Sequence, residues 1–216
     1  MLEHIIKETS ENPQCAIIWL HGLGSNGAEF VPIIPMLKLD RATRFVFPNA
    51  PVMPVTVNGG MAMPAWYDIY EMTIERKIDR QGIAQSNAGL EELIQAQVDQ
   101  GIDRSNIFVI GFSQGGAVAL YHLAHSDRAL GGVVALSTYS PDLDQPLAHS
   151  GVVSTPVAIF HGMHDDVVPE VLGRRSRDRL TQQGFAPSYR TYAMAHNVLP
   201  EEIVDIGAWL NHHTND

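Results

Sequence analysis

The sequence predicts an α/β fold with a mostly parallel central sheet and helices on both of its faces. Two observations lead to this prediction. Short apolar runs alternate along the chain with longer segments whose apolar residues recur at helical spacing. Most of these runs are apolar without interruption, as is typical of parallel strands that helices cover on both faces.

Six apolar runs are expected to form the sheet, after a weakly alternating opening strand. The opening strand covers residues 2–8, and the runs are 15–20, 44–47, 106–112, 132–137, 156–160 and 188–193. Four segments between or after them predict helices: 82–100, 114–124, 169–183 and 200–210. The first has an apolar stripe, the second is apolar nearly all round, and the last opens with proline and two glutamates. No repeat or linker interrupts this order, so we expect one domain over residues 1–216.

Composition excludes several classes of function. The net charge of −10 argues against a surface that binds nucleic acid. The single cysteine, Cys15, excludes an intrachain disulfide and a cysteine metal site. The N-terminus lacks the pattern of a signal peptide, and the longest apolar runs are far shorter than the ~20 residues of a transmembrane helix. We therefore expect a cytoplasmic protein with no transmembrane segment.

A strand-to-helix turn carries the strongest chemical signal. Gly111-Phe112-Ser113-Gln114-Gly115 lies between an apolar strand and the buried helix. This is the context of the nucleophile elbow of α/β-hydrolases, in which flanking glycines allow a tight turn and the serine oxygen is held at the helix N-terminus. The alternative is a glycine-rich turn in which Ser113 caps the helix.

A nucleophilic serine needs a histidine base and a carboxylate that orients it, and in this fold they follow in the order serine, acid, histidine. Among the ten histidines, His196 follows the last strand in a loop and fits this position best, although a surface histidine is the alternative. Asp165 and Asp166 follow the strand 156–160, and spacing does not decide between them. One is expected to orient the base and the other to cap the next helix.

The loops around this site carry two further features. His161 and His164 lie beside the two aspartates, so a metal site is an alternative there, but a serine mechanism needs no metal. An oxyanion hole needs two backbone amides. We expect one from Gln114 and the other from Leu23, in the glycine turn after the strand 15–20.

The sequence resembles the bacterial carboxylesterase II and acyl-protein thioesterase group, the phospholipase/carboxylesterase family, over nearly its whole length. The matching segments are Leu20-His21-Gly22-Leu23-Gly24, Phe47-Pro48-Asn49-Ala50-Pro51, Pro54-Val55-Thr56, Met63-Pro64-Ala65-Trp66-Tyr67-Asp68, the elbow, His161-Gly162 with Asp165, and His196. In relatives an acidic residue often follows the first of these segments, where this chain has Ser25-Asn26.

The resemblance implies a serine esterase with the triad Ser113, Asp165 and His196. It selects Asp165 over Asp166, supports the Leu23 and Gln114 amides, and implies no cofactor. It also implies acyl ester substrates of short to medium chain length, with acylated proteins or lysophospholipids as alternative substrates. A non-catalytic binding protein on the same fold is the alternative from another class.

The proline-rich, apolar segment 48–72 fits neither a strand nor a helix and is expected to border the binding site. Within it, Met61, Met63 and Trp66 are expected to form part of the wall for the acyl chain, opposite Leu23. The sequence leaves open whether the protein is a monomer or a homodimer.

Overall fold

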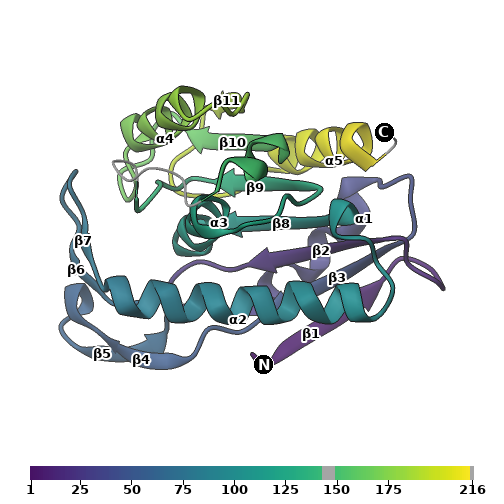
Figure 1. Cartoon of the computed structure of the whole chain (residues 1–216). Helices are drawn as coiled ribbons and strands as arrows, with labels where there is room; N and C mark the ends of the chain where they lie inside the picture. The colour runs from purple at the N-terminus through teal and green to yellow at the C-terminus, as the bar shows by residue number, and fades with distance from the viewer. Residues whose placement is uncertain (143–148, 215–216) are drawn as a thin grey trace.

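A seven-stranded sheet forms the centre of the computed structural model, which describes residues 1–142 and 149–214 (Figure 1). Its strands in chain order are β1 (His4–Glu8), β2 (Cys15–Leu20), β3 (Thr43–Pro48), β8 (Ile107–Phe112), β9 (Gly132–Leu136), β10 (Val157–Gly162) and β11 (Ser188–Tyr192). In space the order is β1-β3-β2-β8-β9-β10-β11. Only β1 pairs antiparallel in this sheet, and the other pairs are parallel, which confirms the predicted fold class.

Helices cover both faces of the sheet. On one face lie α2 (Arg80–Asp99), α3 (Gln114–His125) and α4 (Glu170–Gln182), and on the other α1 (Ile34–Leu37) and α5 (Pro200–Thr214). Neighbouring residues of β2 separate accordingly: Ile18 packs under the first group and Ile17 under the second. The uninterrupted apolar runs reflect this double burial. No helix in the described ranges is long and apolar enough to cross a membrane.

All seven predicted strands and all four predicted helices are confirmed, with ends that shift by a few residues. The short helix α1 was not predicted. Neither were four 3-10 segments: η1 (Gly27–Ile33), η2 (Thr56–Asn58), η3 (Arg104–Asn106) and η4 (Ser150–Ser154). Such short elements carry too few residues to show a periodic pattern.

The segment expected to be an irregular loop instead holds small antiparallel hairpins. β4 (Val52–Val55) pairs with β5 (Met61–Pro64), and β6 (Ile69–Glu71) pairs with β7 (Lys77–Ile78). Proline is tolerated in β4 and β5 because each strand has only one partner. The Asp68 carboxylate accepts hydrogen bonds from the Thr56 amide and hydroxyl, at 2.7 and 2.6 Å, and so ties the two hairpins together.

The parallel strands bring distant segments to one edge of the sheet. β2, β8 and β10 end there, and in Figure 1 their arrowheads point toward the side on which the β6–β7 hairpin lies. The chain after β8 enters Ser113, the chain after β10 enters Asp165, and the chain after β11 enters His196. Side chains far apart in sequence therefore meet at this edge.

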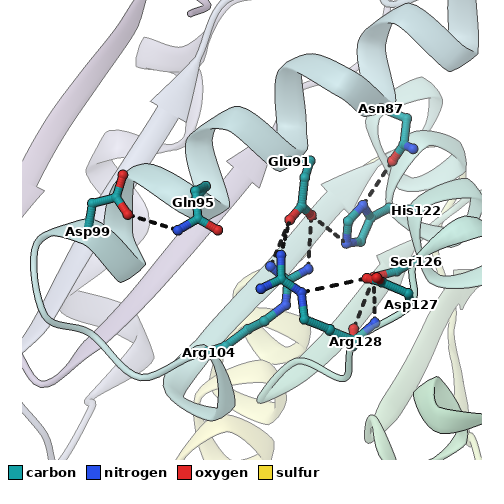
Figure 2. A network of polar contacts seen from close by, with 9 residues as sticks. All are labelled: Asn87, Glu91, Gln95, Asp99, Arg104, His122, Ser126, Asp127 and Arg128. Carbon is teal, nitrogen blue, oxygen red and sulfur yellow. Dashed lines mark hydrogen bonds and ion pairs between the residues drawn. The ribbon is translucent and has the colours of Figure 1, made fainter.

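A polar network holds α2 against α3 (Figure 2). Glu91 of α2 accepts a two-pronged ion pair from Arg104, with N···O distances of 2.8 and 2.9 Å, and a further contact from Arg128 at 3.2 Å. On α3, His122 lies 2.9 Å from Asn87 Oδ1 through its Nδ1 atom. Burial lowers the pKa of His122 to about 4, so it stays neutral and donates from Nδ1. Its role is to join α2 to α3.

A buried glutamate at the start of α5 predicts how stability varies with pH. Glu202 is fully buried, its Oε1 has no hydrogen-bond partner in the part of the chain that the structure describes, and burial raises its pKa to about 8. In the unfolded chain it ionises near its usual value of 4.5, so the folded protein binds the extra proton between about pH 4.5 and 8, and stability falls as pH rises through that window.

Glu202→Gln is therefore expected to raise the free energy of unfolding relative to wild type, and to do so increasingly from pH 5 to pH 8. Between pH 5 and pH 8 the gain grows by on the order of 3 kcal/mol. Chemical denaturation at both pH values measures it, because other titrating groups cancel in the difference. Glu201→Gln is the matched control, since its side chain is 68% exposed. A pH-independent gain for Glu202→Gln would contradict the prediction.

Candidate active site

Ser113 occupies a strained turn between β8 and α3. Its backbone φ is 53°, in a region that residues other than glycine rarely adopt. Glycine is required beside it: a Cβ on Gly115 would lie 2.5 Å from the Leu20 carbonyl oxygen, and one on Gly111 would collide with the Gly115 backbone. This is the geometry expected of a nucleophile elbow. The Ser113 side chain makes no capping hydrogen bond to α3 in the described residues, so the alternative of a simple helix cap is not supported.

Ser113, His196 and Asp165 form a continuous hydrogen-bonded chain. His196 Nε2 lies 2.9 Å from Ser113 Oγ, and His196 Nδ1 lies 2.7 Å from Asp165 Oδ2. The Phe112 ring packs on the imidazole with the two centroids 4.8 Å apart. With Nδ1–H donated to the carboxylate, Nε2 faces the serine hydroxyl as an acceptor.

The structure distinguishes between the two adjacent aspartates. Asp165 is buried, and its Oδ1 accepts hydrogen bonds from the Val167 and Val168 amides at 3.0 and 2.7 Å. Burial raises the pKa of Asp165, but the hydrogen bonds from His196 and Val168 outweigh it, and the pKa lies below its usual value. Asp166 is exposed, and α4 begins after Pro169 without a side-chain cap, so the expectation that the second aspartate caps this helix is wrong.

The backbone amides of Leu23 and Gln114 stay our predicted donors of an oxyanion hole. Leu23 and Gln114 both line the cavity at Ser113. The Gln114 amide is the first of α3, where no preceding carbonyl can accept from it. The Leu23 amide has no acceptor within residues 1–142 and 149–214.

His21 holds the glycine turn that carries Leu23. It is fully buried, its Nδ1 lies 2.7 Å from the Gly22 carbonyl oxygen, and its Nε2 accepts from the Ala50 amide at 3.0 Å. Burial lowers the pKa of His21, so the neutral ring donates from Nδ1 and accepts at Nε2. No pattern in the sequence indicates this positioning role of His21.

The alternative of a metal site beside the aspartates is not supported. Among the described residues no group of three or more histidine, cysteine, aspartate or glutamate side chains is arranged to hold a metal ion. His161 is buried and lies 2.8 Å from the Val168 carbonyl oxygen through Nε2, while His164 is exposed. His161 therefore holds the loop that carries Asp165.

A cavity of about 260 Å³ opens at Ser113 and His196. Its apolar lining comes from Leu23, Ile69, Met72, Phe112, Val167 and Val168. The three residues expected to form the acyl wall do not line it, which corrects that expectation. Met61 is 64% exposed on β5, and Met63 accepts a contact from Asn58 Nδ2. Trp66 is only 2% exposed, and its indole donates to the His21 carbonyl oxygen at 2.8 Å.

The Trp66 segment instead supports the elbow and the oxyanion turn from behind. The Gln114 side chain accepts from the Trp66 amide at 2.9 Å and donates to the Tyr67 carbonyl oxygen at 2.7 Å. The apolar character of this segment thus reflects burial. No spacing in the sequence predicts the two hydrogen bonds of the Gln114 side chain.

This placement predicts that substitutions at Trp66 and Met72 differ in how they change the preference between short and longer esters. Trp66→Ala is expected to destabilise the protein by ~3–5 kcal/mol and to lower kcat/KM for acetate and octanoate esters by similar factors. Met72→Ala, at a cavity residue, should lower kcat/KM for octanoate about tenfold while sparing acetate, at ~0.8 kcal/mol for each buried methylene. Thermal denaturation and kinetics on the two esters measure both effects. If Trp66→Ala lowered kcat/KM for the octanoate ester alone, Trp66 would contact the acyl chain after all.

The sequence pattern that defines the phospholipase/carboxylesterase family matches residues 2–214. The chain belongs to this family. It is 36% identical to acyl-protein thioesterase 1 of Cryptococcus neoformans over 229 aligned positions, which cover 97% of this chain and 96% of that protein. It is 37% identical to acyl-protein thioesterase 1 of Kluyveromyces lactis, with 90% of each chain covered.

Solved structures agree with the family. The chain is similar to acyl-protein thioesterase 2 of Zea mays, with a TM-score of 0.86, 28% identity and 99% of each chain covered. A carboxylesterase of Bacillus cereus has a TM-score of 0.83 at 20% identity, with 99% and 95% covered, and this likeness shows the fold alone. The α/β-hydrolase fold and the predicted family are thereby confirmed, and the chain is a hydrolase of the esterase and thioesterase type.

Proposed function

We propose that this chain is a serine carboxylesterase that hydrolyses acyl esters of short to medium chain length. The observation that carries the proposal is the hydrogen-bonded chain from Ser113 through His196 to Asp165, with Ser113 in the strained turn. Membership of a family of esterases and thioesterases supports the same reaction class.

The first half of the reaction acylates the enzyme. Ser113 Oγ attacks the acyl carbon while His196 Nε2 takes the hydroxyl proton, and the Asp165 carboxylate stabilises the charged imidazole. The carbonyl oxygen becomes an oxyanion that the Leu23 and Gln114 amides stabilise. The bond to the leaving alcohol then breaks, and His196 gives the proton to that alcohol.

The second half releases the acid. Water enters beside His196 and loses a proton to Nε2 as it attacks the acyl carbon of the ester on Ser113. The second oxyanion collapses, the Ser113 oxygen leaves and takes the proton back, and the carboxylic acid departs. The residues present complete this cycle with no cofactor.

Thioester hydrolysis is the second candidate, because relatives at 36–37% identity are acyl-protein thioesterases. The same steps apply with a thiol as the leaving group. We also propose that the protein lies in the cytoplasm and that residues 1–216 form a single domain. Sedimentation analysis decides whether it is a monomer or a homodimer.

A panel of matched substrates tests the proposal. 4-Nitrophenyl esters from acetate to dodecanoate are compared with thioesters of the same acyl chains. We expect kcat/KM for the esters to rise up to fourfold per methylene until the cavity is full, at ~0.8 kcal/mol each. Thioesters favoured 100-fold or more at every length would identify a thioesterase. No turnover and no burst of nitrophenol with any substrate would indicate a non-catalytic binding protein.

A further inference from the structure

A second, polar cavity adjoins the cavity at Ser113. It measures about 440 Å³ and lies between the β6–β7 hairpin, the segment after β9, and α4. Arg76, just before β7, and Tyr139, after β9, line both cavities. The two cavities therefore meet at these two side chains, which also line the cavity that contains Ser113.

The guanidinium at this junction is buried, and its hydrogen-bond partners among the described residues are neutral groups. Arg76 is 8% exposed, and it forms no ion pair among the described residues. Its Nη1 donates to Met72 Sδ at 3.2 Å, and its Nη2 donates to the Val167 carbonyl oxygen. Its Nε is buried and has no partner in residues 1–142 and 149–214. Since arginine remains charged at all relevant pH values, burying it among neutral acceptors alone is costly, and an anion would offset that cost.

Two tyrosines add hydrogen-bond donors to the same wall. The hydroxyls of Tyr67 and Tyr139 lie 2.9 Å apart, and the Tyr139 ring packs 5.0 Å from the Arg76 guanidinium carbon. Burial raises the pKa of both tyrosines, so both keep their hydrogens. Only one hydrogen is used between them, and in the described part of the chain the other has no acceptor. Glu75, Asp142 and Asp178 also line the larger cavity, but none of them forms an ion pair with Arg76 in the described residues. Arg76 and the tyrosine pair therefore hold donors that no described acceptor uses.

We propose that Arg76 and the Tyr67–Tyr139 pair form an anion-binding subsite that selects ester substrates carrying a carboxylate away from the scissile bond. The proposal rests on the esterase function above and specifies its substrate class. A carboxylate supplies the negative charge that would pair with Arg76 and the acceptor that the remaining tyrosine hydrogen needs. The competing explanation is that Arg76 only positions the loop of Val167, whose amide bonds Asp165.

Matched esters distinguish these explanations and locate the carboxylate. Phenyl hydrogen adipate and phenyl adipamate differ only by a carboxylate or a carboxamide at the end of the acyl chain. 3-Acetoxybenzoate and 3-acetoxybenzamide make the same comparison on the alcohol side. Each pair is assayed with wild type, Arg76→Met and Arg76→Lys. Arg174→Met is the control, because it removes a charge from α4 outside both cavities.

In one of the two pairs we expect the ratio of kcat/KM, carboxylate over carboxamide, to fall tenfold or more in Arg76→Met, the change that one charge-assisted hydrogen bond produces. Arg76→Lys should retain part of the ratio, and Arg174→Met should retain all of it. Unchanged ratios in both pairs, or an equal loss on all four esters, would overturn the subsite. If wild type hydrolysed none of the esters, neutral ones included, the proposed function itself would fail instead.

A second measurement covers the case in which Arg76→Met does not fold. Adipate and the neutral adipamide are compared as competitive inhibitors of wild type against 4-nitrophenyl acetate. Tighter inhibition by adipate, by tenfold or more, supports the subsite. Equal inhibition overturns it.

Discussion

Ser113→Ala is expected to lower kcat for 4-nitrophenyl esters by about 10⁶-fold and to abolish labelling by a phosphonate probe. Losses of this size follow removal of a triad serine, because no other group can form the acyl-enzyme. The fold should survive, since alanine needs no more space than serine. Kinetics and mass-spectrometric mapping of the probe on wild type measure the result, with the adduct expected on Ser113 alone.

Ser137→Ala is the matched control for this experiment. Ser137 is fully buried and has a positive φ of 45°. Its hydroxyl has no partner among the described residues, and it does not line the cavity at Ser113. It should keep both activity and labelling. An adduct on any serine other than Ser113 would refute the assignment of the nucleophile.

The sheet was predictable because burial on both faces leaves a simple pattern. β2 extends over the same residues as the uninterrupted apolar run 15–20, and its side chains alternate between the two helix layers. The elbow was predictable for a similar reason: the close approach of α3 to β2 requires glycine at 115, and that requirement appears in the sequence. In both cases local residue type records a tertiary constraint directly.

The acyl wall could not be predicted in the same way. Trp66 has the residue type of a pocket wall, but its indole hydrogen bond to the His21 carbonyl oxygen turns it into the core. The wall is built by residues such as Val167 and Met72, which have no pattern of their own. Arg76 shows the same limit, because a charged residue in a polar turn looks solvated until the Val167 and Tyr139 segments cover it.

The choice between the two aspartates was likewise open to spacing alone. Both follow the same strand, and the family resemblance favoured Asp165. The physical difference is that the Asp165 side chain turns inward, where it accepts from two amides of its own loop and from His196. Asp166, one residue later, is exposed. Neighbouring residues of a loop can thus differ completely in burial, and a loop has no periodic pattern in the sequence that would predict which of them is buried.

Asp165→Asn is therefore expected to lower kcat by about 10⁴-fold, and Asp166→Asn by less than about threefold. The asparagine can still accept from the Val167 and Val168 amides through its oxygen, which turns its amide group toward His196. That group donates to Nδ1, so the imidazole holds its proton on Nε2 and cannot take the proton of Ser113. Steady-state kinetics on the two variants test this, and circular dichroism checks that both fold. A larger loss in Asp166→Asn than in Asp165→Asn would move the acid by one residue and leave the short contact between Asp165 and His196 without a catalytic role.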